Sequence, residues 1–280
     1  MKLLRYGPKG REKPGLLDKD GVIRDLSEII PDITPATLAA GALAKVKKAK
    51  PESLPVVKKG VRIGACVGQV RNFIAIGLNY TDHAIETGAP IPAEPIVFNK
   101  APSCIVGPND DVMIPRGSKK TDWEVELAII IGKTGSYIDE ADALKHVAGY
   151  AVCHDVSERA FQTERGGQWT KGKGCPTFGP LGPWLVTRDE IKDVQKLGMY
   201  LDVNGKRMQT GNTATMIFGV AHLVHYVSQF MLLEAGDVIT TGTPPGVGLG
   251  MKPPKFLKGG ETVTLGIDGL GSQTQKIVKY

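Results

Sequence analysis

From residue 72 onward, short runs of β-branched and apolar residues recur between Gly/Pro turns, and this pattern constrains the fold more than any other feature of the 280-residue chain. Only two segments of this region, 157–165 and about 215–232, have helical composition. Because the strands do not alternate with helices, the pattern argues against a doubly wound parallel sheet and predicts a β-dominated α+β domain. Asn204-Gly205 and Asp268-Gly269 predict hairpin turns. The expected strands are 73–76, 96–98, 125–131, 148–153, 184–186, 200–203, 238–241 and 263–267.

The first 62 residues differ in texture from the rest, and we predict that 1–62 form a small N-terminal domain. Leu3, Leu4 and Tyr6 indicate a strand, Asp20-Gly21 marks a hairpin turn, and 35–48 has helical composition. A connection rich in Pro and Lys follows these elements. The predicted catalytic domain then covers 70–280.

The formal net charge of +6 is local and does not predict a nucleic-acid partner. Residues 1–72 carry 15 basic and 7 acidic residues, whereas the rest of the chain has a small acidic excess. No aromatic residue is interleaved with the lysines of 45–59 to stack on bases. We therefore interpret this basic run as a solvated linker face.

Neither a membrane segment nor a cysteine framework is predicted. The longest uninterrupted apolar run is 127–131, far short of the ~20 residues of a spanning helix, and the first residues lack a signal-peptide core. The four cysteines, Cys66, Cys104, Cys153 and Cys175, include no CxxC pair, which argues against a zinc module and a disulfide scaffold. We expect a cytoplasmic protein with buried free thiols and no membrane partner.

The segment DWEVELAIII at 122–131 carries the sharpest chemical signal. In a strand, Glu124 and Glu126 share one face with their Cα atoms roughly 6.8 Å apart, so both carboxylates can approach one cation. Asp155 follows the apolar run 148–153 and is well placed to join them. Three carboxylates without paired Cys or His favour Mg²⁺ or Mn²⁺ over zinc, with Ca²⁺ a further candidate. The alternative is an exposed edge strand with polar alternation.

A second candidate is the pair His83 and Glu86 in the segment GLNYTDHAIE. If 80–87 forms a short helix, the two side chains are three residues apart and face the same side. A carboxylate that holds an imidazole is a general-base arrangement able to deprotonate water near neutral pH. The alternative is an ordinary pair on a helix surface.

Two glycine-rich segments complete the candidate site. The segment 167–173 opens like a phosphate-binding P-loop, but Gly174 stands where that motif needs Ser or Thr, and no strand precedes it. We therefore reject nucleotide binding and predict an active-site loop that presents Lys171 or Lys173. The segment TTGTPPGVG at 240–248 offers hydroxyls and backbone amides to an anionic ligand, with a plain turn as the alternative.

In this order, the motifs resemble the fumarylacetoacetate hydrolase family over about 71–267. The matching segments are GLNYTDHAIE, DWEVELAIIIG, GYAVCHDVSER, QWTKGKG and GDVITTGTPPGVG. The resemblance implies a mixed β-sandwich roll of the fumarylacetoacetate hydrolase type with a small N-terminal domain. It also implies a homodimer that binds Mg²⁺ or Mn²⁺ through Glu124, Glu126 and Asp155.

The same resemblance implies roles for further residues. His83 and Glu86 fall on a catalytic dyad carried by a mobile lid, and Lys173 falls on a catalytic lysine. The role of Lys171, an additional basic residue of the same loop, stays open. The implied substrate-binding positions are Arg159, Gln162 and Thr243.

The implied activity is hydrolysis of the C–C bond of a 2,4-dioxo acid of the acylpyruvate type to pyruvate and a carboxylic acid. The lysine-containing loop is most similar to 2,4-dioxo-3-deoxy-fuconate hydrolase-like members, which act on sugar-acid derivatives. A ureidoglycolate lyase and a 2-hydroxyhepta-2,4-diene-1,7-dioate isomerase or decarboxylase are the alternatives. An inactive metal-binding regulatory protein is an alternative of another class, but retention of the dyad, the three carboxylates and Lys173 speaks against it.

Overall fold

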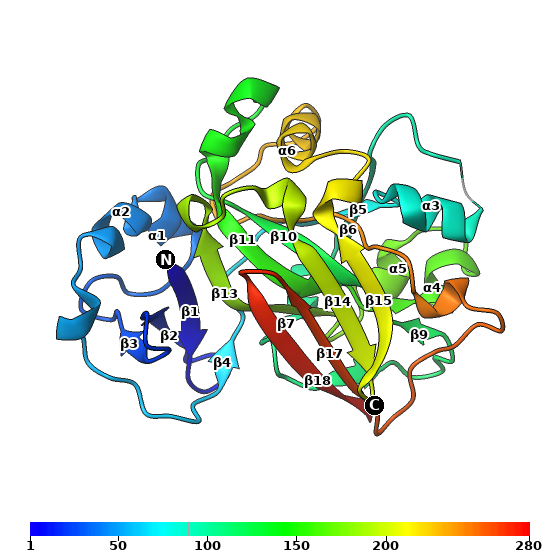
Figure 1. The fold of residues 1–280 in the computed structure, drawn as a ribbon, viewed down its shortest axis with the longest axis horizontal. Helices are drawn as coiled ribbons and strands as arrows, with labels where there is room; N and C mark the ends of the chain where they lie inside the picture. The colour runs from blue at the N-terminus through cyan, green and yellow to red at the C-terminus, as the bar shows by residue number, and fades with distance from the viewer. Residues whose placement is uncertain (89) are drawn as a thin grey trace.

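An 11-stranded mixed sheet is the framework of the computed structural model, which describes residues 1–88 and 90–280 (Figure 1). Its main path runs in the order β3-β2-β1-β13-β11-β10-β16-β5-β6, with β4 paired to β1 and β7 paired to β13. Its strands are β1 (Lys2–Tyr6), β2 (Lys13–Leu17), β3 (Ile23–Asp25), β4 (Ile63–Gly64), β5 (Phe73–Gly77), β6 (Ile96–Lys100), β7 (Ile105–Val106), β10 (Val125–Ile131), β11 (Val147–His154), β13 (Gly179–Thr187) and β16 (Val238–Thr240).

A five-stranded sheet packs against the centre of this framework as a second layer. Its strand order is β15-β14-β17-β18-β8, and β14 and β17 contact β10 of the large sheet (Figure 1). A separate two-stranded pair joins β9 to β12. This architecture confirms the expected β-dominated α+β class. The strands of the two smaller sheets are β8 (Val112–Ile114), β9 (Thr121–Asp122), β12 (Ser157–Glu158), β14 (Gly198–Val203), β15 (Lys206–Asn212), β17 (Thr262–Ile267) and β18 (Gly271–Lys279).

Each of the eight runs expected as strands falls on a strand, and both expected hairpin turns are present. Asn204-Gly205 joins β14 to β15, and its residues have the positive φ angles, 51° and 75°, that a type I′ turn needs. Asp268-Gly269 lies in the turn between β17 and β18. The sequence pattern misses strand β18 because its buried face carries Gln273 and Gln275, so its polar and apolar residues do not alternate clearly.

Strand β10 lies at the centre of the large sheet, between β11 and β16, and all seven of its residues are buried. One of its faces meets the five-stranded sheet. Because side chains alternate along a strand, Glu126 shares a face of β10 with Ala128 and Ile130. This position rules out the alternative of an exposed edge strand for the ExE segment.

Six α-helices lie in the described part of the chain, and the two that the sequence predicts after residue 150 are shorter than expected. Helix α4 begins only at Arg159, because Ser157 and Glu158 pair with β9 as strand β12. No described helix is both long and apolar enough to cross a membrane. The helices are α1 (Pro35–Ala39), α2 (Ala42–Lys47), α3 (Thr81–Thr87), α4 (Arg159–Thr163), α5 (Thr170–Lys173) and α6 (Val220–Ser228).

The N-terminal strands extend the large sheet at the end remote from α3 (Figure 1). Strand β1 pairs with β13 and so joins the N-terminal strands to the rest of the large sheet. An ion pair makes a second contact between the two predicted domains: the Arg62 guanidinium donates to both carboxylate oxygens of Asp110, at 2.8 and 2.6 Å. Burial would raise the pKa of Asp110, but the hydrogen bonds from Arg62 and from the Gly107 N–H, together with the charge of Arg62, outweigh burial and lower that pKa. The division into domains at 1–62 and 70–280 stays a prediction.

Candidate metal-binding active site

A cavity of about 290 Å³ opens where strands β5, β6 and β10 meet helices α3, α4 and α5. Most of the site residues predicted from the sequence line it. Two others lie directly behind the lining: Asp155 is bonded to Lys173, and Glu86 is bonded to His83. The predicted residues in the lining are His83, Glu124, Glu126, Arg159, Gln162, Lys173 and Thr243.

The register of β10 against β11 assembles the three predicted carboxylates. Glu126 pairs with Cys153 and Val125 with His154, so Asp155, which directly follows β11, comes to lie opposite Glu124. The Asp155 N–H donates to the Glu124 carbonyl at 3.0 Å and continues the ladder beyond the end of β11. All three side chains are buried, and one oxygen of each lies within 4.8 Å of the others.

Three buried cations surround this cluster of carboxylates. The Lys173 ammonium bridges Glu124 and Asp155, at 2.6 and 2.7 Å from their carboxylate oxygens. An Arg159 Nη2 donates to the other oxygen of Glu124 at 2.6 Å, and Lys100 Nζ donates to Asp155 at 2.5 Å. In the described part of the chain, Glu126 takes part in no salt bridge.

Because the cations are unevenly distributed, the pKa values of Glu124 and Glu126 shift in opposite directions. Burial raises the pKa of Glu126, and the negative charges of Asp155 and Glu124 raise it further. Burial acts in the same direction on Glu124, but the charges of Lys173 and Arg159 outweigh it and hold its pKa well below its ordinary value. Because Glu126 lacks a positive partner and all three ligands offer oxygen, the cluster fits a hard divalent cation.

The loop that follows β16 supplies backbone donors to the site. The Gly242 N–H donates to a Glu126 oxygen at 2.9 Å. Gly242 has a φ of +86°, and a Cβ atom there would lie 2.9 Å from the Cβ of Asn79, so the position requires glycine. Thr243 lies in the cavity wall, where its hydroxyl donates to a carbonyl of β10 at 2.9 Å and accepts from Gln209 at 2.8 Å. Carboxylate binding by Thr243 stays a prediction.

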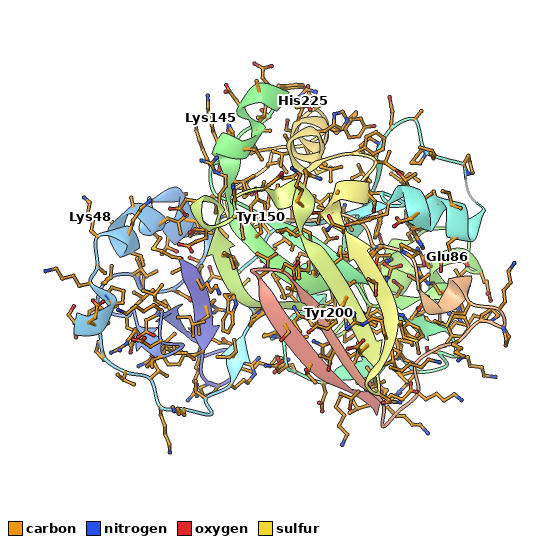
Figure 2. All side chains as sticks on the ribbon, viewed as in Figure 1. Lys48, Glu86, Lys145, Tyr150, Tyr200 and His225 are labelled. Carbon is orange, nitrogen blue, oxygen red and sulfur yellow. The ribbon has the colours of Figure 1, made fainter. Side chains whose placement is uncertain are left out.

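Helix α3 positions the predicted dyad, as the three-residue spacing indicates. His83 Nδ1 lies 3.1 Å from a Glu86 carboxylate oxygen, and that carboxylate accepts from the Gly246 N–H at 3.0 and 3.1 Å. Figure 2 shows Glu86 between α3 and the orange segment near residue 250. With Nδ1 donating to Glu86, the basic nitrogen of a neutral ring is Nε2. The predicted lid also includes Ala89, which lies outside the described residues, so lid motion stays a prediction.

The two lysines of the glycine-rich loop occupy different environments. Lys173 is buried in the cavity, whereas Lys171 is exposed and donates to the Arg165 carbonyl at 2.5 Å. The segment follows helix α4 and contains helix α5, whereas a P-loop follows a strand. Lys171 therefore stabilises the loop and does not line the cavity.

Sequence reasoning misses two buried residues that organise the site. Lys100 ends β6 and pairs with Asp155, and its only local signal is a charged residue at the end of an apolar run. Asp122 accepts from Arg159 Nε at 2.9 Å and from the Gly248 N–H at 2.7 Å. Asp122 stands two residues before Glu124, so extending the alternation of the ExE motif by one step identifies it.

Comparison with known proteins agrees with this geometry. The family model described as the fumarylacetoacetate (FAA) hydrolase C-terminal domain matches residues 72–278. The chain belongs to the fumarylacetoacetate hydrolase family. A Burkholderia ambifaria (strain MC40-6) protein that bears a provisional hydrolase name is 62% identical over 276 residues, which is 98% of each chain.

Solved structures of the family include both hydrolases and isomerases. Fumarylacetoacetate hydrolase from Exiguobacterium antarcticum superposes with a TM-score of 0.88 at 35% identity, over 100% of both chains. The 5-carboxymethyl-2-hydroxymuconate delta-isomerase of Mycobacterium smegmatis gives 0.78 at 30% identity, over 100% of this chain and 99% of the other. Maleylpyruvate hydrolase from Sphingobium sp. SYK-6, in complex with manganese(II) and pyruvate, gives 0.81 at 28% identity with the same coverage. This chain is therefore a member of an enzyme family with hydrolase and isomerase relatives.

Proposed function

We propose that this protein is a metal-dependent hydrolase that cleaves the C3–C4 bond of a 2,4-dioxo acid of the acylpyruvate type. The products are pyruvate and a carboxylic acid. One observation carries the proposal: the same cavity is lined by His83, which Glu86 holds from behind, and by the carboxylates Glu124 and Glu126, with Asp155 beside them. A base for water next to a cation-binding cluster is the arrangement that this hydrolysis requires.

The three carboxylates would hold Mg²⁺ or Mn²⁺. When bound, such a cation would act as a Lewis acid toward the 1-carboxylate and 2-oxo oxygens of the substrate. The related maleylpyruvate hydrolase, whose structure contains manganese(II) and pyruvate, supports this assignment. A cluster of three oxygen ligands around an uncompensated Glu126 supports it independently.

In the proposed reaction, His83 accepts a proton from water while Glu86 stabilises the imidazolium that forms. The water oxygen bonds to C4, and the C3–C4 bond then breaks with its electron pair moving to C3. The resulting pyruvate enolate takes up at C3 the proton that His83 accepted. One water is consumed, and pyruvate and the acid derived from the acyl group leave.

Two cations of the chain oppose the negative charge of the enolate. Lys173 lies at the centre of the carboxylate cluster, and Arg159 lies beside it on the other oxygen of Glu124. Both side chains are buried, so their charges act in a water-poor environment where electrostatic stabilisation of a developing anion is strong. Asp122 holds the Arg159 guanidinium in place.

A test separates hydrolysis from isomerisation and decarboxylation. With Mg²⁺ present, His83→Ala should nearly abolish C–C cleavage of an acylpyruvate and leave binding of Mg²⁺ and oxalate intact, because His83 is not a proposed ligand. Loss of CO₂ from oxaloacetate needs no attacking water, so this activity should persist in the variant. Equal proportional losses of both activities, or no hydrolysis by the wild type, would instead support the isomerase or lyase alternative that relatives such as the delta-isomerase represent.

A further inference from the structure

We infer that Asp122 is a positioning residue for two parts of the site: the Arg159 guanidinium, which it binds directly, and the dyad carboxylate of Glu86, which it holds through the loop 246–250. That these two parts serve one reaction rests on the proposed function. Asp122 ends β9, and its side chain is fully buried. It is not among the described residues that line the cavity, so it acts through its partners.

Four N–H groups use the full acceptor capacity of the Asp122 carboxylate. Its Oδ1 accepts from the Gly248 N–H at 2.7 Å and from the Trp123 N–H at 2.8 Å. Its Oδ2 accepts from Arg159 Nε at 2.9 Å and from the Leu249 N–H at 3.0 Å. A carboxylate offers about four lone-pair sites, two on each oxygen. Each oxygen of Asp122 therefore holds one backbone N–H of the loop, and Oδ2 also holds Arg159.

The same loop holds the dyad carboxylate. The Gly246 N–H donates to both oxygens of Glu86, at 3.0 and 3.1 Å, and one of these oxygens lies 3.1 Å from His83 Nδ1. Trp123 fixes the loop at the same residue, since its indole N–H donates to the Gly246 carbonyl at 3.0 Å. Figure 2 shows Glu86 between α3 and this loop. A displacement of the loop backbone would therefore reach the carboxylate that orients His83.

Two glycines seat the loop closely against its neighbours. Gly246 has a φ of +102°, and a Cβ atom there would overlap a backbone carbonyl of β15. A Cβ atom on Gly248 would overlap the Lys255 carbonyl and would lie 2.7 Å from Asp122 Oδ1. Val247, between the two glycines, is buried. This packing leaves the short backbone segment between its bonds to Glu86 and to Asp122 little freedom to adjust at one end alone.

The substitution Asp122→Asn separates the two roles of this residue. Asparagine has one acceptor oxygen, and its amide nitrogen only donates. Because the Arg159 guanidinium is positively charged, it should retain that oxygen. The amide nitrogen then faces the Gly248 N–H, which loses its acceptor. The variant should therefore release the loop and leave Arg159 bound.

Amide hydrogen exchange in the full-length protein without metal measures this coupling and needs no turnover. In Asp122→Asn, exchange should rise at least about tenfold in peptides that cover 246–250, because the loop loses a hydrogen bond to a charged group. Exchange in α3 should rise about threefold, because Glu86 ties this helix to the loop. Unchanged exchange in α3 would overturn the inference.

A second variant tests the coupling from its other end. Glu86 has a side chain that is 24% exposed, so Glu86→Ala should fold whether or not Asp122→Asn does. It removes both acceptors of the Gly246 N–H, and exchange in 246–250 should again rise about threefold. Unchanged exchange in 246–250 would contradict the coupling.

Asp18→Asn is the matched control. The Asp18 carboxylate also binds an arginine and two backbone N–H groups of a loop: it accepts from Arg24 Nε at 2.7 Å, from the Asp20 N–H at 3.0 Å and from the Val22 N–H at 2.9 Å. These residues belong to the N-terminal strands and their turn, remote from the cavity. Exchange in 246–250 and in α3 should not change in this variant, and a rise equal to that in Asp122→Asn would overturn the inference.

Kinetics and calorimetry with Mg²⁺ distinguish positioning of the dyad from an effect through Arg159 alone. In Asp122→Asn, kcat for acetylpyruvate should fall at least about tenfold, whereas the affinity for oxalate should change less than about threefold, because Arg159 keeps its partner. Asp122→Ala removes every acceptor and should lower both quantities. Equal proportional losses of kcat and of oxalate affinity in Asp122→Asn would overturn the inference.

The outcomes separate this inference from the proposed function. If the coupling fails in hydrogen exchange while wild type hydrolyses acetylpyruvate, the proposed function stands. If exchange follows the expected pattern while wild type hydrolyses no acylpyruvate, only the proposed function fails.

Discussion

Replacement of Lys100 by methionine should lower the free energy of unfolding by about 3 kcal/mol in the absence of metal. Lys100 Nζ lies 2.5 Å from Asp155 and 2.5 Å from the Lys173 carbonyl, and its side chain is fully buried. Burial would lower the pKa of Lys100, but the charge of Asp155 and the hydrogen bond to it, with contributions from Cys104 and Cys153, together outweigh burial and raise that pKa, so the residue is charged. Methionine preserves the apolar length of the side chain and removes only the charge and its donors.

The magnitude follows from what the substitution leaves behind. Removing one partner of a buried ion pair costs about 3–5 kcal/mol, because the remaining charge is uncompensated. Asp155 keeps Lys173 at 2.7 Å, which places the expected loss at the lower end of that range. The unpaired Lys173 carbonyl is already part of this loss, since an orphaned buried acceptor costs about 1–3 kcal/mol by itself.

Urea denaturation with a chelator present, followed by tryptophan fluorescence, measures this loss. Lys47→Met is the matched control. Lys47 makes the same type of pair with Asp189 at 2.8 Å, but its side chain is 67% exposed, so solvent screens the pair and the loss of stability should be much smaller than for Lys100→Met. In a double-mutant cycle, Asp155→Asn should be less destabilising in the Lys100→Met background than alone, by about 2 kcal/mol. A loss below about 1 kcal/mol for Lys100→Met, or equal losses at the two lysines, would refute the argument from burial.

Three further predictions concern the carboxylates, the lid and the N-terminal contact. Glu124→Gln and Glu126→Gln should both weaken Mg²⁺ binding in calorimetry. Without metal at pH 7, only Glu124→Gln should lower the melting temperature, because it leaves Lys173 and Arg159 without their shared carboxylate, whereas Glu126 forms no salt bridge in the described residues. Equal shifts in the melting temperature would contradict this charge distribution. Amide exchange in α3 (Thr81–Thr87) should slow when Mg²⁺ and oxalate bind, and unchanged exchange would exclude closure of a lid. Asp110→Asn should lower the free energy of unfolding by about 1–2 kcal/mol at pH 7. Because folding lowers the pKa of Asp110, its contribution to stability is present above the ordinary carboxyl pKa of about 4 and should fade as the pH falls below it. Unfolding measurements on the wild type and Asp110→Asn over this acid range test the prediction.

Features that depend on local geometry can be predicted from the amino-acid sequence alone. Alternation along the extended segment that leads into β10 places Glu124 and Glu126 on one face, because side chains two residues apart in extended backbone share a face. His83 lies beside Glu86 because residues three apart in a helix share a face. The turn residues Asn204-Gly205 required positive φ angles and therefore predicted their hairpin.

Which residues from distant segments meet at the site depends on how the strands are ordered and paired in three dimensions. The order of the strands brings Lys100, at the end of β6, to Asp155. The register of β10 against β11 brings Asp155 to Glu124. Neither the order nor the register is set by the residues within one strand. The same holds for charge. Glu124 and Glu126 stand in one motif, yet their pKa values shift in opposite directions, because Lys173 and Arg159, supplied by other elements, form salt bridges with Glu124, whereas the negative charges of Asp155 and Glu124 dominate at Glu126. Electrostatic environment depends on distance in space, so a linear motif cannot specify it.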